Sequence, residues 1–201
     1  MRSLLLLVAA IPFSFSIHAQ DLRIRVLDEE MDRDTRLLYD FMGVQRFSIE
    51  VELPGEKKHD VIWVARSMTP EGEERRDTIF NTLAMGKMFA GGYPTDPLKD
   101  LVVVIGKDDN GDLKIKGNGF NGKVSIHADA AYALMNGIDG QELVTRKFNE
   151  AIPVMIYSQP YVDKNNASVL RYCYTNEIPP DQWCSTFGVP HLIILELTVL
   201  S

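Results

Sequence analysis

The sequence predicts an α+β fold dominated by antiparallel β-sheet, sandwich-like, with two to four short helices. Apolar and polar residues alternate in residues 22–26 and 47–53, which is the period of a half-buried strand. Turn signals such as Pro54-Gly55 separate most of the apolar runs. The predicted strands follow one another instead of alternating with helices, so a parallel α/β fold is disfavoured.

About nine segments have strand character. Residues 60–68 follow the turn at Pro54-Gly55 and are expected to return as an antiparallel partner of the strand before it. Residues 101–106 form a continuous apolar run, which is typical of a buried strand. The predicted strands span residues 21–27, 46–53, 60–68, 101–106, 112–117, 122–128, 153–159, 168–175 and 191–200.

Helical patterns are fewer. Residues 139–153 begin with Asp139, which can cap a helix, and Glu142 can reach back as in a capping box. Residues 129–137 form a shorter predicted helix that ends in an Asn-Gly pair, a common helix stop. Two further helical patterns span residues 35–42 and 77–89.

The first residues have the pattern of a secretory signal peptide. Arg2 supplies a positive charge, Leu4–Ile11 is an apolar run, and Ala19 ends an A-x-A-like cleavage site. The apolar run is too short for the roughly 20 residues that a membrane-spanning helix needs. We therefore expect removal of residues 1–19. Residues 20–201 would then be a single β-rich globular domain, secreted or periplasmic, with no membrane span.

The overall charge limits the partners that the protein can have. The chain has 201 residues and a formal net charge of −7 at pH 7. Nucleic acids and anionic membrane surfaces are bound through positive patches, so an acidic chain argues against both. The sequence also lacks the glycine-rich patterns that bind phosphates and dinucleotides, so we expect no cofactor.

Residues 107–112 resemble the start of a calcium-binding loop, because Asp108, Asn110 and Asp112 offer oxygen ligands at alternate positions. An EF-hand then needs glycine, where this chain has Leu113, and a glutamate at its last position, where this chain has a glycine. The Asn-Gly pair between two apolar runs instead predicts a hairpin turn. We therefore expect no metal site.

The chain contains two cysteines, Cys173 and Cys184, separated by ten residues. In a secreted chain such a pair usually forms a disulfide. A redox pair would have the C-x-x-C spacing, and a zinc site would need more Cys or His ligands nearby. We predict a Cys173–Cys184 disulfide, which would contribute on the order of 3 kcal/mol in the entropic description. Two free thiols and a redox or metal pair remain as alternatives.

Aromatic residues gather around this cysteine loop. Tyr172 and Tyr174 share one face of the predicted strand 168–175, and Trp183 lies within the loop. If exposed, these three side chains form an apolar platform with hydrogen-bonding tips, suited to a sugar ring or a protein partner. If buried, they complete the core on the second side of the sheet. Tyr172, Tyr174 and Trp183 are the predicted binding residues.

Catalytic candidates are few. His127 lies close to Asp129 in the sequence, and a carboxylate can orient a catalytic histidine. A serine triad would also need a nucleophile elbow such as G-x-S-x-G, which the sequence lacks. His59 lies in a charged turn and is expected to be solvated. His191 is expected to be a core or edge residue of the last strand.

The leader that ends at Ala19-Gln20, together with an acidic chain of this size, resembles small secreted proteins of the Bacteroidetes, many of which belong to uncharacterised families of unknown function. Asp77-Thr78-Ile79 is similar to the short site at which that group attaches O-glycans to exported proteins. Asn166 begins a formal N-glycosylation sequon. The resemblance implies no active-site residue, but it raises the expectation of a carbohydrate ligand.

Three functions are compatible with these patterns. The first is a secreted or periplasmic, non-catalytic domain that binds a glycan or an envelope protein. The second is a hydrolase of an unrecognised family that uses His127 and Asp129. The third is a structural or assembly component of the cell envelope, in which residues 191–200 form an edge strand that pairs with another chain. The missing catalytic motifs favour the first.

Overall fold

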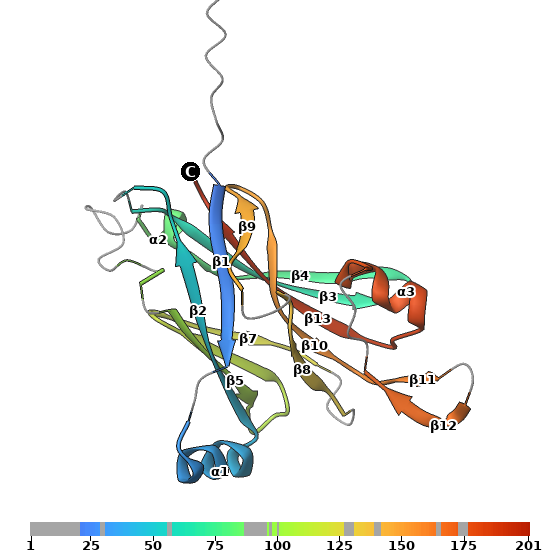
Figure 1. The fold of residues 1–201 in the computed structure, drawn as a ribbon. Coiled ribbons are helices and arrows are strands. Elements are labelled where there is room, and N and C mark those ends of the chain that lie inside the picture. The colour runs from blue at the N-terminus through green and yellow to red at the C-terminus, as the bar shows by residue number, and fades with distance from the viewer. Residues whose placement is uncertain are drawn as a thin grey trace, which may run out of the picture.

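The structure is a computed structural model, which describes residues 21–201 with gaps. The described residues form two antiparallel sheets, a separate two-stranded hairpin and short helices (Figure 1). This confirms the predicted α+β, sandwich-like fold. The residues beyond position 20 that it does not describe are 29–30, 56–57, 87–95, 97, 100, 127–130, 139–141, 164–165 and 173–176.

The first sheet, sheet A, has six strands in the order β7-β6-β5-β2-β1-β9, and neighbouring strands are antiparallel. Its alternating residues point to opposite faces. Ile24 and Val26 are buried in the core, whereas Arg25 on the outer face pairs with Glu50. The strands are β1 (Asp21–Asp28), β2 (Val44–Glu52), β5 (Leu101–Lys107), β6 (Leu113–Gly117), β7 (Phe120–Val124) and β9 (Val144–Lys147).

The second sheet, sheet B, has the order β4-β3-β13-β10-β8. Its central strand is β13, which pairs with β3 on one side and β10 on the other. The prediction that residues 191–200 form an edge strand is therefore wrong, because both sides of β13 are hydrogen-bonded to neighbouring strands. The strands are β3 (Val61–Thr69), β4 (Gly72–Asn81), β8 (Ala133–Asn136), β10 (Ile152–Ser158) and β13 (Leu192–Val199).

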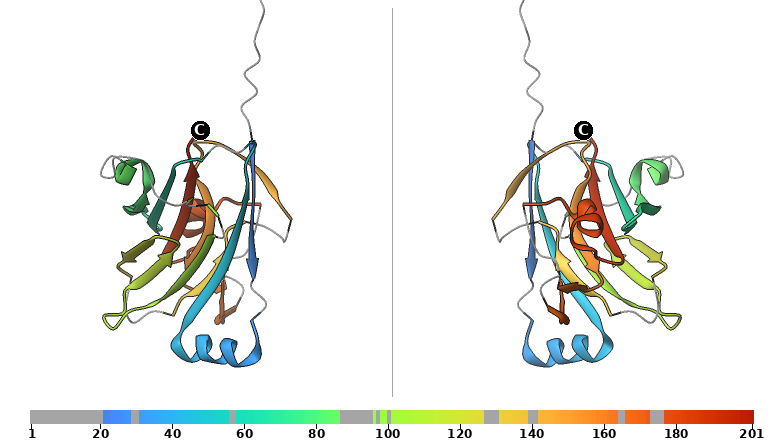
Figure 2. Two further views of the ribbon diagram at one scale, coloured as in Figure 1. Left: turned by 90° about the vertical axis from the view of Figure 1, so that its left-hand side faces the viewer. Right: turned by 90° about the vertical axis from the view of Figure 1, so that its right-hand side faces the viewer.

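One apolar core joins the inner faces of the two sheets, and Figure 2 shows the layers from the side. The Phe120 ring centroid lies 5.5 Å from that of Trp63 and 5.0 Å from that of Phe80. Strands β4 and β7 approach so closely that a Cβ atom at Gly122 would lie 1.9 Å from Cγ2 of Ile79. The sandwich is therefore closed along this edge.

A smaller apolar cluster covers the outer face of sheet B. It is built from Trp183 and Cys184 of helix α3 (Trp183–Phe187), which pack on Met68 of β3 and Ile194 of β13. A 3₁₀ turn, η1 (Pro180–Gln182), leads into α3. The hairpin of β11 (Tyr161–Asp163) and β12 (Asn166–Arg171) lies beside this region in Figure 1.

Helix α1 (Arg33–Met42) confirms the helix predicted at residues 35–42. The Asp32 carboxylate accepts hydrogen bonds from the backbone N–H groups of Asp34 and Thr35, which caps the first turn. Gly43 ends the helix in the left-handed conformation, at φ 61°. The helix connects β1 to β2 at the end of the molecule opposite the C-terminus (Figure 2).

The helices predicted at residues 129–137 and 139–153 are wrong. The first range contains β8, and the second contains β9 and the start of β10. Each of β8 and β9 is a short edge strand held by hydrogen bonds to a strand far away in the sequence. Such tertiary pairing overrides helical spacing. The pattern at residues 77–89 is helical only in α2 (Thr82–Gly86), which follows β4.

Candidate functional site

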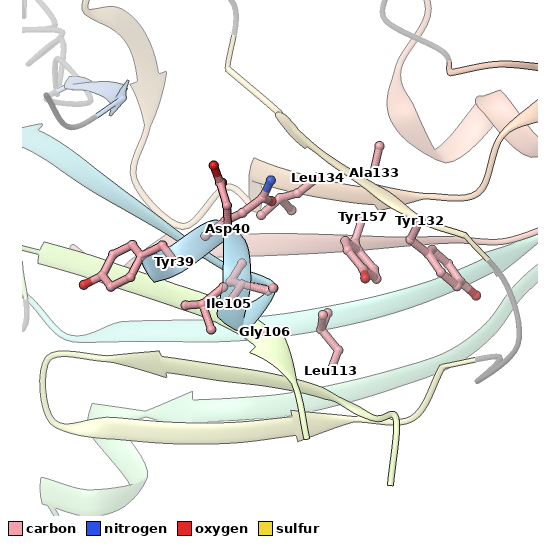
Figure 3. A pocket seen from close by; sticks show the side chains of 12 residues that line it. Tyr39, Asp40, Ile105, Gly106, Leu113, Tyr132, Ala133, Leu134 and Tyr157 are labelled. Carbon is pink, nitrogen blue, oxygen red and sulfur yellow. The ribbon is translucent and has the colours of Figure 1, made fainter. Parts of the chain in front are cut away.

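A pocket of about 390 Å³ opens between the ends of the two sheets, beside helix α1. Its lining includes Tyr39 and Asp40 of α1, Ile105 of β5, Leu113 of β6 and Tyr157 of β10 (Figure 3). Its volume lies in the range of small-molecule sites, which are usually lined by apolar and aromatic side chains with a few polar groups. The pocket has this composition, so it is the candidate binding site.

One end of the pocket is formed by a stacked pair of tyrosines. The rings of Tyr132 and Tyr157 are parallel within 2°, with their centroids 4.8 Å apart, and they lie side by side in Figure 3. The Nζ atom of Lys107 lies 5.9 Å from the Tyr132 centroid, within the range of a cation–π contact. The pair therefore gives the pocket a flat aromatic end.

The Tyr132 hydroxyl is held from behind by buried polar groups. Its oxygen lies 2.6 Å from Nδ1 of His191 and accepts a 3.0 Å hydrogen bond from Nε2 of Gln159. On the other side of the imidazole, Nε2 lies 2.6 Å from Oγ of Ser67. His191 is only 2% exposed. The tyrosine pair thus rests on a polar support within sheet B.

The Tyr157 hydroxyl is a neutral hydrogen-bonding group at physiological pH. Burial raises the pKa of this phenol, and the nearby Tyr132 and Tyr172 raise it further. Removing a proton would place a negative charge in a poorly hydrated site, which is unfavourable. Tyr157 can therefore donate a hydrogen bond as well as accept one.

A second pocket of about 470 Å³ also lies beside helix α1. The two pockets share lining residues from α1, β2 and β8, among them Tyr39, Asp40 and Gln45. Arg36 and Arg46 line only the second pocket. The shared side chains therefore stand beside both pockets.

The structure buries one of the three residues that were predicted to form a binding platform. Trp183 is only 2% exposed, and its indole N–H donates to the carbonyl of Ile178 over 2.8 Å. Its ring therefore belongs to the small cluster on sheet B and offers no exposed face. Tyr172 is 43% exposed at the end of β12. Tyr174 lies outside the described residues.

The sequence-predicted catalytic candidates, His127 and Asp129, also lie outside the described residues. His59 is buried, contrary to the expectation of a solvated residue, because its ring stacks on Phe148 and its Nδ1 lies 2.9 Å from the Leu200 carbonyl oxygen. The part of the chain that the structure describes contains no group of three or more His, Cys, Asp or Glu side chains arranged to hold a metal ion.

The turn predicted at Asn110-Gly111 is confirmed. The Gly111 N–H donates to the Asp108 carbonyl over 2.9 Å, and Gly111 has a φ of 82°. The Nζ atom of Lys123 lies 2.7 Å from the carboxylates of both Asp108 and Asp112. A protein ammonium group therefore stands between the two carboxylates that had suggested a calcium loop.

Cys184 is buried in the cluster on sheet B, where its thiol sulfur lies 3.5 Å from the carbonyl oxygen of Met68. Its predicted partner, Cys173, lies outside the described residues. The disulfide therefore stays a prediction.

Comparisons with protein-family models, with curated proteins and with solved structures give no match for this chain. Within the described ranges, no helix has both the length and the apolar character that crossing a bilayer requires.

Sequence reasoning missed the pocket and its support. Tyr39 and Tyr132 lie in helical patterns, and His191 lies in an apolar strand, so none of them stood out. The only local signal was the presence of polar or aromatic residues next to strand ends: Tyr132 precedes β8, Gln159 follows β10 and His191 precedes β13. That signal acquires meaning only when the strand order is known.

Proposed function

We propose that the protein is an exported, non-catalytic glycan-binding protein, with the pocket beside α1 as its sugar site. The observation that carries the proposal is the parallel pair Tyr132 and Tyr157 at the end of a pocket of about 390 Å³. Tyrosine combines an apolar ring with a polar tip. The C–H face of a sugar ring can pack on such a ring while the sugar hydroxyl groups bond to neighbouring polar side chains.

The polar groups of the site suit recognition better than hydrolysis. A glycosidase uses two carboxyl groups placed about 5 to 9 Å apart across the bond that is cleaved. Asp40 is the only carboxylate among the described residues that line either pocket. Together with Gln45 it can accept and donate hydrogen bonds to sugar hydroxyls. A second pocket that shares lining residues lies beside the first, so we choose disaccharides as the test ligands.

The test is calorimetric titration of the purified protein with cellobiose and with N,N′-diacetylchitobiose. Tyr39→Ala and Gln45→Ala remove pocket contacts from α1 and β2, and each is expected to weaken binding by about tenfold, which corresponds to about 1.4 kcal/mol. Phe41→Ala is the matched control, because Phe41 is on the same helix but is 90% exposed and does not line either pocket. It should bind the sugar as the wild type does.

Two results would overturn the proposal. One is the absence of heat and of any thermal shift with both disaccharides and with longer fragments of the same polymers. The other is sugar binding that Phe41→Ala abolishes and that Tyr39→Ala and Gln45→Ala leave unchanged. Thermal unfolding of each variant shows whether a loss of affinity reflects a loss of folding.

A second candidate function is binding of an envelope protein through helix α1. The helix has no buried residue. Four of its large apolar side chains are 53 to 90% exposed, namely Leu37, Leu38, Phe41 and Met42. An apolar helix face of this kind fits a groove in a protein partner. A membrane surface is the poorer match, because membrane-surface helices are rich in Lys and Arg and this helix balances Arg33 and Arg36 with Asp34 and Asp40.

This second function is tested by a photo-crosslinking residue placed at Phe41 in the native host. One discrete heterologous adduct is expected, and Leu38→Glu should remove it. A crosslinker at Thr78, which is exposed on β4 far from α1, is the control. An adduct of twice the chain mass would point to a second copy instead, and adducts with lipid alone would point to a membrane; either result rejects the protein partner.

A further inference from the structure

The polar support behind Tyr132 crosses the end of sheet B strand by strand. The sheet order is β4-β3-β13-β10-β8. Glu74 lies on β4, Ser67 on β3, His191 just before β13, Gln159 just after β10 and Tyr132 just before β8. Every strand of the sheet thus contributes one polar side chain to a single row, which ends at the pocket.

The polar groups of this row are joined by short contacts. Gln159 donates to the Tyr132 oxygen, which lies 2.6 Å from Nδ1 of His191. At the other end, Ser67 donates its hydroxyl hydrogen to the Glu74 carboxylate over 3.3 Å, and the Ser67 oxygen lies 2.6 Å from Nε2 of His191. Both ring nitrogens of His191 therefore contact a hydroxyl group, and the imidazole joins Tyr132 to Ser67.

Burying the polar groups of this row costs free energy, and packing alone does not explain that cost. His191 and Ser67 are at most 5% exposed. A buried polar network must be fully hydrogen-bonded to avoid a desolvation penalty, and apolar residues of the same size would fill the space without that risk. Apolar residues, however, could not hold the Tyr132 hydroxyl in one direction. In Figure 3 this hydroxyl points away from Tyr39 and Asp40, which leaves the ring itself at the pocket end.

We propose that His191 is a positioning residue of the binding site. Together with Ser67 and Gln159 it fixes the Tyr132 ring parallel to Tyr157, so that the aromatic end of the pocket is preformed before a ligand arrives. Preformed sites bind more tightly because less motion is lost on binding. This inference rests on the proposed function for its ligand, but its geometric content can be tested on the protein alone.

The first experiment is NMR of the free protein labelled at histidine and tyrosine. In the unmodified protein, ring-to-ring contacts between Tyr132 and Tyr157 are expected. His191→Phe keeps the ring volume but removes both nitrogens, and it should abolish the ring-to-ring contacts between Tyr132 and Tyr157. His59→Phe is the control, because His59 is also buried and lies near the opposite end of β13. It should leave these contacts intact.

The second experiment measures cellobiose and N,N′-diacetylchitobiose binding by calorimetry. His191→Phe and Tyr132→Phe are each expected to weaken binding by about tenfold, and the double variant by no more than either one, because both remove the same hydrogen bond. His59→Phe should lower the melting temperature without changing the affinity. Glutamine at position 191, as in His191→Gln, can still bond to the Tyr132 hydroxyl and should restore part of the affinity.

The outcomes separate the inference from the proposed function. Unchanged Tyr132–Tyr157 ring contacts in His191→Phe overturn the positioning role even if sugars bind. Additive losses in the double variant overturn it as well. If neither sugar binds but the ring contacts of the unmodified protein and of His191→Phe are as expected, the glycan proposal fails and the positioning of the aromatic pair is upheld.

Discussion

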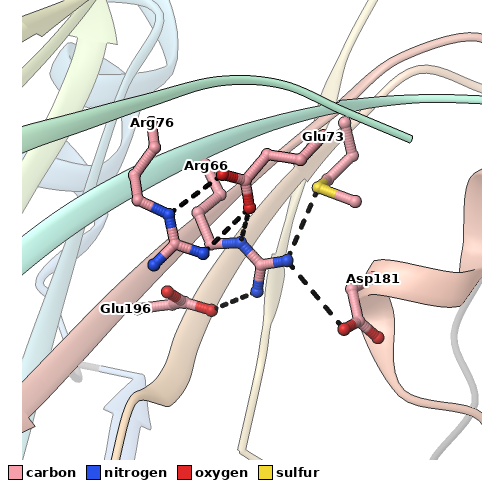
Figure 4. A network of polar contacts seen from close by, with 6 residues as sticks. Arg66, Glu73, Arg76, Asp181 and Glu196 are labelled. Atoms are coloured by element: carbon pink, nitrogen blue, oxygen red, sulfur yellow. Dashed lines mark hydrogen bonds and ion pairs between the residues drawn. The ribbon is translucent and has the colours of Figure 1, made fainter. Parts of the chain in front are cut away.

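The guanidinium of Arg66 donates a 2.7 Å hydrogen bond to the carboxylate of Glu196 on the outer face of sheet B, where Glu196 is only 4% exposed. Figure 4 shows the surrounding network. Arg66 also donates to Glu73 over 2.7 Å and lies 3.9 Å from Asp181 of η1. One arginine therefore links β3, β4 and β13 to the turn that leads into α3.

We predict that Arg66→Met destabilises the protein by about 3 kcal/mol, because it leaves the Glu196 carboxylate buried without its cation. Adding Glu196→Leu should recover most of this loss, since no buried charge then remains. The control is Arg23→Met, which breaks the exposed Arg23–Glu52 pair and should cost under about 1 kcal/mol. Urea unfolding measures all three, and equal losses for Arg66→Met and Arg23→Met would contradict the prediction.

Acid should weaken the fold through Glu73. Hydrogen bonds from Arg76 and Arg66, acting against partial burial, lower the pKa of this carboxyl from 4.5 to about 2. A lowered folded-state pKa stabilises the fold fully above the unfolded-state value, and this stabilisation disappears as the pH falls from about 4.5 toward 2. We expect Glu73→Gln to be less stable at neutral pH and to lose less stability in that interval. Parallel stability curves for the two proteins would refute this.

Gly137 is required where β8 meets β10. A Cβ atom there would lie 2.7 Å from the carbonyl oxygen of Pro153, a backbone atom that cannot move aside easily. We expect Gly137→Ala to cost about 1 to 3 kcal/mol, as overpacking does. Gly106→Ala is the matched control, because its Cβ would first meet a side-chain methyl group of Val44 at 3.0 Å. Thermal unfolding that ranks the two variants in the opposite order would reject this account.

The predicted Cys173–Cys184 disulfide can be tested chemically. Alkylation of the unfolded, unreduced protein, followed by mass spectrometry, should add no label, whereas alkylation after reduction should label both cysteines. Reduction is expected to lower the free energy of unfolding by about 3 kcal/mol. Labelling of both cysteines without a reductant, in protein prepared by export to an oxidising compartment, would exclude the disulfide.

The correct predictions concern local structure that is controlled by neighbouring residues. The alternation in β1 sets which side chains face the core, since successive residues of a strand point to opposite faces. Asp32 and Gly43 cap α1 through groups within a few residues. The left-handed Gly111 forms the turn between β5 and β6. Each of these effects acts within one element or one turn.

The wrong predictions concern residues whose structure depends on a partner far away in the sequence. Residues 144–147 have helical spacing, yet they pair with Asp21–Ile24 on β1 and become a strand. The run at residues 191–200 could have been an edge strand, but β3 and β10 enclose it on both sides. Trp183 could have been exposed, but the fold lays α3 on the outer face of sheet B. The spacing of residues along the chain does not predict any of these contacts.

By itself, the sequence determined the class of fold, the inward and outward faces of its alternating strands, the helix at residues 35–42 and the hairpin turn at Asn110-Gly111. Only the tertiary structure decided the strand order, and with it the candidate site. Tyr39, Tyr132, Tyr157 and His191 come from four separate parts of the chain, and hydrogen bonds between distant strands bring them together. A binding site made in this way depends on how strand ends meet in space, which short-range periodicity does not specify.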